Sequence, residues 1–92
     1  MVGIPEKAAN YALSTGKQAC KVYANQEAID AFQQVIYWFD NDSSLQFAHI
    51  EWLFQALSEL GKVFYDTGNL DNAKNTLNRA IALGKEHRMN RK

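Results

Sequence analysis

Apolar residues recur at helical spacing along almost the whole of this 92-residue chain. Residues three or four positions apart share one face of a helix, and stripes with this spacing cover residues 8–20, 28–39, 45–64 and 70–83. The single proline, Pro5, precedes the first stripe, in the first turn that a helix allows it. No stretch alternates between apolar and polar residues for long enough to predict a strand. We therefore expect an all-α fold of four helices joined by short turns.

The boundaries of these helices are marked by polar residues and glycines. Asn25 is a suitable N-cap for the second helix, and the polar cluster 40–44 predicts the next loop. Gly68 can take the left-handed conformation that ends the third helix, and Asn69 can cap the fourth. Gly16 lies inside the first helix without a second helix breaker beside it. We interpret Gly16 as a site where another helix packs closely.

Composition and charge exclude several classes of protein. An apolar fraction of 47% is too high for a disordered tail, and no run approaches the roughly 18 apolar residues of a membrane span. Ten basic and ten acidic residues leave no net charge, which disfavours a nucleic-acid partner. The single cysteine, Cys20, cannot form an internal disulfide and fits a reducing compartment. We therefore expect a cytoplasmic protein without membrane or nucleic-acid partners.

Motifs that carry catalysis or hold a cofactor are missing from the sequence. There is no phosphate-binding loop, glycine-rich dinucleotide turn, HExxH or CxxC motif. Cys20 has no histidine near it in sequence, which favours a packed or groove-facing thiol over a nucleophile. His49 and Glu51 are two residues apart, so a helix places them on different sides and disfavours metal binding. We expect no enzyme activity, no cofactor and no metal.

The second half of the chain contains a spaced set of large and small residues. The set comprises Leu57, Leu60, Gly61, Phe64, Gly68, Leu70, Ala73, Leu77 and Ala80. It resembles the tetratricopeptide repeat (TPR), a helix–turn–helix unit of about 34 residues with the pattern W-x2-L-G-x2-Y…A-x3-F…P. The terminal proline of that pattern is replaced by Lys85. The resemblance implies that Gly61 and Ala73 are small because the two helices of the unit cross closely there.

The first half is similar to the second, although its first helix is degenerate. Aligning Ala28 with Ala73 places Gly16 on Gly61 and Phe32 on Leu77. The halves are offset by 45 residues, which exceeds the roughly 34 residues of one TPR unit. The expected organisation is one TPR-like domain over residues 1–92. It comprises a degenerate repeat at about 9–42 and a clear repeat at about 54–87, whose first helix is extended from about residue 45.

Two short segments suggest a narrower resemblance. Residues 22–29 and 80–85 are similar to the helical-repeat region beside the ATPase module of large multidomain regulators, including some with nucleotide-cyclase domains. This resemblance implies that the chain is one piece of a longer protein.

The TPR resemblance implies a protein-interaction module, because the first helices of stacked TPR units line a groove that binds peptides or partner helices. The corresponding positions here are Asn10, Leu13, Lys17, Cys20, Lys21, Gln55, Ser58, Lys62, Tyr65 and Asp66. Leu13 and Glu59 stand where the family's carboxylate-clamping members have lysine and asparagine, so a receptor for C-terminal carboxylates is not expected. The alternative is that these residues form an ordinary solvated helix face.

Consecutive aromatic residues suggest a second contact surface. One helix cannot bury Tyr37, Trp38 and Phe39 on a single face, so Tyr37 and Trp38 are candidates for an interface with another protomer or domain. Two repeats are fewer than the three that usually stabilise such a stack. We therefore expect a homo-oligomer or neighbouring domains in a longer chain. The alternative architecture is a plain four-helix bundle that serves oligomerisation or scaffolding within a larger regulatory protein.

Overall fold

The computed structural model describes residues 3–87, without the side chains of residues 3–5, 43–44, 46–47 and 87. Four helices make up almost all of this range: α1 (Gly3–Lys21), α2 (Asn25–Asp40), α3 (Ser43–Asp66) and α4 (Leu70–His87). No strand occurs between residues 3 and 87, so the all-α prediction is confirmed. None of these helices is long and apolar enough to cross a membrane. The basic residues Arg88, Arg91 and Lys92 lie outside the described range.

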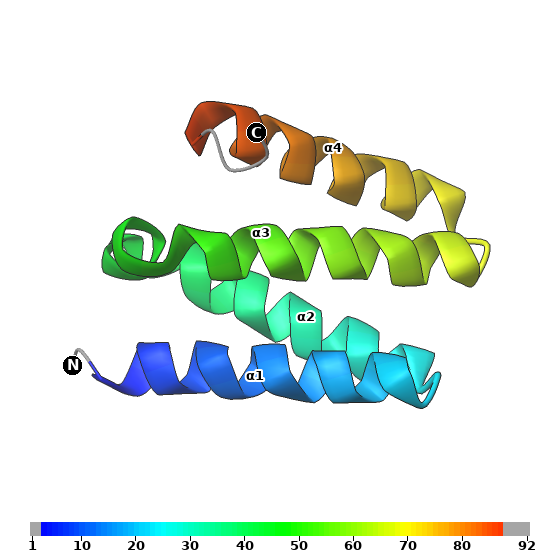
Figure 1. Ribbon diagram of the computed structural model, residues 1–92, viewed down its shortest axis with the longest axis horizontal. Helices are drawn as coiled ribbons and strands as arrows, with labels where there is room; N and C mark the ends of the chain where they lie inside the picture. Colours follow the sequence, from blue (N-terminus) through cyan, green and yellow to red (C-terminus); the bar gives the residue numbers. More distant parts are fainter. Residues whose placement is uncertain (1–2, 88–92) are drawn as a thin grey trace.

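The helices form two antiparallel pairs, α1 with α2 and α3 with α4, and α3 lies in the middle of the molecule (Figure 1). α1 packs against α2, α3 packs against α4, and α2 joins the pairs by packing against α3. α1 also contacts α3, whereas the main chains of α1 and α4 make no contact within residues 3–87. α1 and α4 therefore lie on opposite sides of α3, at the two edges of the molecule (Figure 1).

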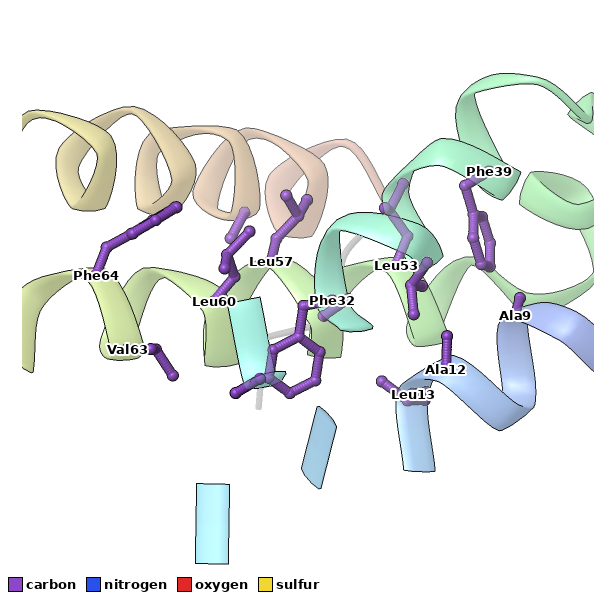
Figure 2. Close-up of a cluster of buried hydrophobic side chains, with 14 of the residues drawn as sticks. Ala9, Ala12, Leu13, Phe32, Phe39, Leu53, Leu57, Leu60, Val63 and Phe64 are labelled. Carbon is purple, nitrogen blue, oxygen red and sulfur yellow. The ribbon is translucent and has the colours of Figure 1, made fainter. Parts of the chain in front are cut away.

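The hydrophobic core is built mainly from the facing sides of α1, α2 and α3. Phe32, Phe39, Val35 and Leu57 are its largest fully buried side chains. Figure 2 shows Phe32 of α2 in the same cluster as Ala9, Ala12 and Leu13 of α1 and the leucines of α3. The small residues of α1 bring the α2 aromatics close to its backbone, which explains why an alanine-rich helix can anchor one side of the core.

Two glycines mark the closest approaches within the helix pairs. A Cβ added at Gly16 would lie 2.5 Å from the ring of Phe32, so the prediction of a close-packing site there is confirmed. A Cβ added at Gly61 would lie 2.5 Å from the side chain of Leu77. These contacts occupy the positions that the sequence alignment placed on one another, and each joins the two helices of one pair.

The turn between α3 and α4 agrees with the prediction from the sequence, whereas the turn between α1 and α2 does not. Gly68 has a φ of 84°, the left-handed conformation expected for it, and Asn69 immediately precedes α4. The prediction that Asn25 caps α2 was wrong: Asn25 is the first helical residue, and Ala24 stands before it without a side-chain capping hydrogen bond. The left-handed residue of this turn is Tyr23, with a φ of 59°.

Replacing Tyr23 by glycine is expected to stabilise the protein by roughly 0.5–1 kcal/mol, because an L-residue pays a steric cost in the left-handed region. The exposed Tyr23 side chain adds little packing that would be lost. Thermal unfolding followed by circular dichroism measures the change. The control is Tyr11→Gly in the middle of α1, which should lower the melting temperature because glycine weakens a helix interior. A loss of stability in both variants would contradict the prediction.

α3 is interrupted near its start by His49, whose φ of −137° and ψ of 47° are not helical. The sequence predicted an uninterrupted helix here. The His49 ring stacks on Trp52, with the ring planes 7° apart, and its Nε2 lies 2.6 Å from Oε2 of Glu6 in α1. The interruption therefore lets one side chain contact both its own helix and the beginning of α1.

Candidate protein-interaction face

The predicted groove positions lie on the two adjacent helices α1 and α3, and we call this surface the α1–α3 face. Its exposed residues are Asn10, Lys17, Lys21, Lys62, Tyr65 and Asp66, and its half-buried residues are Cys20, Gln55 and Ser58. Leu13 departs from the prediction: it is only 5% exposed and belongs to the hydrophobic core. Leu13 lies four residues after the buried Ala9 and three before the buried Gly16, on the side of α1 that contacts its neighbours.

Electrostatics at Cys20 show that the two helices contribute to one local environment. Burial raises the pKa of the Cys20 thiol above its ordinary value, and the carboxylates of Glu59 and Asp66 raise it further. The Lys62 ammonium acts in the opposite direction and lowers the pKa. Three ionisable side chains of α3 are thus close enough to α1 to influence its cysteine. A thiol held in its neutral form is a poor nucleophile, in agreement with a packing role for Cys20.

Reaction of Cys20 with a thiol reagent is expected to need a higher pH in the folded protein than in urea. Only the thiolate reacts, and the raised pKa moves its formation above the ordinary value of 9.0. Glu59→Gln should speed the reaction near pH 8, because it removes a charge that raises the pKa of Cys20. Lys62→Gln should slow the reaction, because it removes a charge that lowers this pKa. The rate of disulfide exchange with Ellman's reagent across pH measures both effects. Shifts in the same direction would show that α3 does not set the Cys20 environment.

One polar atom on this face has no partner within the described structure. Oε1 of Gln55 is buried and accepts no hydrogen bond. A buried acceptor without a donor costs roughly 1–3 kcal/mol, so a donor that reached it would recover much of this cost. Gln55 stands beside Ser58 and Glu59 on the half-buried edge of α3. Within residues 3–87, Gln55 is the member of the predicted set with a buried polar atom that lacks a hydrogen-bond partner.

The aromatic residues at the end of α2 divide as expected between core and surface. Phe39 is fully buried, Trp38 is half-buried and Tyr37 is exposed. The Tyr37 and Trp38 rings meet edge to face, with centroids 5.5 Å apart and planes at 76°. Their role as an interface stays a prediction, because no contact with another chain is present to test it.

A groove between α2 and α4 was not predicted. It has a volume of about 450 Å³, and Leu57, Leu60 and Phe64 of α3 line it. Its polar lining is Gln33, Asp40, Asn72, Asn75, Thr76 and Arg79. Arg79 donates to Asp40 Oδ1 at 2.7 Å and links α4 to α2. The helical spacing of Asn72, Thr76 and Arg79 is the sequence signal that marks a polar side of α4 facing this groove.

No protein-family model matches the chain, and no curated protein or solved structure gives a significant match. The resemblance to the TPR family therefore rests on the residues and their spacing. Within the described range, no group of three or more histidine, cysteine or carboxylate side chains could hold a metal ion.

Proposed function

We propose that the chain is a non-enzymatic protein-interaction module of the TPR type that binds a partner segment along the α1–α3 face. The observation that carries the proposal is the order in which the helices pack. α1 and α3, the first helices of the two pairs, contact one another, while α4 packs on α3 and not on α1. A stack of helix pairs requires this order, because its first helices must lie side by side to form one continuous face.

The same packing order disfavours the plain four-helix bundle. In an up-and-down bundle each helix has two neighbours around a common axis, so α4 would close the ring by packing on α1. The α1–α4 contact is missing within residues 3–87. α4 is instead linked to α2 by the Asp40–Arg79 ion pair across the intervening groove. An open arrangement leaves the α1–α3 face accessible to a partner.

The chemistry of the face suits a peptide or helix that carries carboxylates. Lys17, Lys21 and Lys62 are exposed on it, and Glu59 and Asp66 lie toward Cys20 at one end. Long lysine side chains contribute mainly to orientation and to the rate of association. Recognition would then require little rearrangement of the helices.

A quantitative pull-down tests this proposal. Immobilised protein is compared with the variant Lys17→Glu/Lys62→Glu, and captured proteins are measured by mass spectrometry. The matched control is Lys74→Glu/Lys85→Glu, which changes the charge equally at exposed positions of α4. Proteins that bind the wild type and the control but are lost with the α1–α3 variant support the proposal. If the Lys17→Glu/Lys62→Glu variant captures the same proteins as the wild type, and circular dichroism shows that it is folded, the proposal is refuted.

A further inference from the structure

The outer side of the α1–α2 pair carries exposed apolar and acidic residues. We call this side the N-terminal end face. Two adjacent hollows lie along it, and their lining includes Tyr11, Thr15 and Glu27 in both cases. Tyr11 is 76% exposed and Val22 is 71% exposed. No α3 residue lines either hollow, so this side faces away from the rest of the molecule.

The hollows of the N-terminal end face carry negative charge. Among the described residues, the charged ones that line them are Glu27 and Asp30, and both are exposed. Asp30 accepts a hydrogen bond from Gln26 one turn earlier on α2. The buried Ala12 and Ala31 line one hollow and the buried Ala19 lines the other, so both hollows combine an apolar surface with at least one carboxylate.

The outer side of α4 carries the complementary combination. Exposed residues one or two helical turns apart form a stripe along it: Leu70, Lys74, Ile81 and Lys85. Leu70 is 58% exposed and Ile81 is 50% exposed, which is unusual for large aliphatic side chains. The stripe lies away from the α4 residues that line the groove toward α2. We call it the C-terminal end face, and its charges are the two lysines.

We propose that a second copy of this chain docks its N-terminal end face on the C-terminal end face of the first. Apolar contacts would join Tyr11 and Val22 to Leu70 and Ile81, while Glu27 and Asp30 approach Lys74 and Lys85. The charge pattern selects this arrangement, because two acidic or two basic faces would repel one another. In a single copy the apolar residues of each face are exposed to water, and a face of opposite charge would bury them.

The positions of the two faces determine the form of the assembly. α1 and α4 lie at opposite edges of the molecule, so one copy can bind a neighbour at each end (Figure 1). A contact between different surfaces is heterologous and does not close after two copies unless the rotation forms a ring. Association should therefore continue beyond the dimer as concentration rises. The α1–α3 face is not used by this contact and remains open along the assembly.

Sedimentation velocity measures the association over a range of protein and salt concentrations. We expect a mean mass that rises continuously with concentration and falls with added salt, because the paired charges are exposed and screened. A chain that stays monomeric up to its solubility limit at low salt would overturn the proposal. An association that stops at a dimer at all concentrations would also overturn it, since it would indicate a symmetric contact.

Charge reversal on one face at a time identifies the surfaces. Glu27→Lys/Asp30→Lys makes both faces basic, and Lys74→Glu/Lys85→Glu makes both faces acidic. Each variant alone should associate about tenfold more weakly or worse than the wild type. An equimolar mixture should recover association, because every contact in it joins a basic face to an acidic one. Failure of the mixture to recover, or tighter association of E27K/D30K alone, would overturn the head-to-tail contact.

The control variant is Lys17→Glu/Lys21→Glu, which makes the same change of charge on the α1–α3 face. It should associate like the wild type, whereas equal weakening would show that net charge alone controls assembly and would overturn the proposal. The two proposed surfaces can thus be separated. Partner capture depends on Lys17 and Lys62, and self-association depends on Glu27, Asp30, Lys74 and Lys85.

Discussion

Phe32→Ala is expected to lower the free energy of unfolding by about 3–5 kcal/mol, the usual cost of removing a buried aromatic ring. Phe32 is 0% exposed, and its ring lies against the Gly16 backbone. The backbone of α1 cannot collapse into the vacated space without separating from α3, so a cavity remains. The total stability of a domain is about 5–15 kcal/mol, and this single change therefore removes a large part of it.

Guanidinium unfolding measures this effect as a lower midpoint with an unchanged slope. The control is Tyr37→Ala on the same helix, which removes an exposed ring and should cost less than about 1 kcal/mol. A similar loss in both variants would mean that the α1–α2 contact is not the tightly packed layer described above.

The helices themselves could be predicted from the sequence because burial and helical spacing are both local properties. Apolar residues such as Ala28, Phe32 and Val35 repeat along one side of α2, and all three are buried. The close packing at Gly16 could also be predicted, because a single glycine inside a helix without a second helix breaker beside it usually has a packing reason. The left-handed Gly68 followed from the same kind of local reasoning.

The features that were missed depend on contacts between distant residues. The interruption of α3 at His49 involves Glu6, 43 positions earlier in the chain, and no local pattern announces that pairing. Tyr23 takes a left-handed conformation because a very short turn connects two tightly packed helices. Asn25, two residues later, is of a type that takes this conformation more readily, but the turn does not place it there. In each case the tertiary structure outweighs a local preference.

The candidate site was predictable to the extent that it follows helix faces. Lys17, Lys21 and Lys62 are exposed as the aligned positions require, whereas Leu13 is buried because α1 turns that side toward its neighbours. The groove between α2 and α4 was missed because it exists only where two helices fail to touch. Such a gap depends on how α3 separates its neighbours, which residue spacing does not encode.

Gly16→Ala and Gly61→Ala should have different effects although both place a Cβ 2.5 Å from a side chain of the partner helix. Each substitution gains about 1 kcal/mol of helix propensity. At Gly16 the obstacle is the fully buried ring of Phe32, which has no free space to enter. Overpacking of this kind costs about 1–3 kcal/mol or more. We therefore expect Gly16→Ala to destabilise the protein by about 1–2 kcal/mol after the propensity gain.

At Gly61 the obstacle is the half-buried side chain of Leu77, which can rotate toward solvent. Moving the Leu77 side chain costs about as much free energy as alanine gains in helix propensity. Gly61→Ala should therefore change the free energy of unfolding by less than about 0.5 kcal/mol. Guanidinium unfolding of the two variants beside the wild type measures the difference. Equal destabilisation would show that the α3–α4 contact is as rigid as the α1–α2 contact. Equal stabilisation would show that neither glycine is required by close packing, because both partners could move aside.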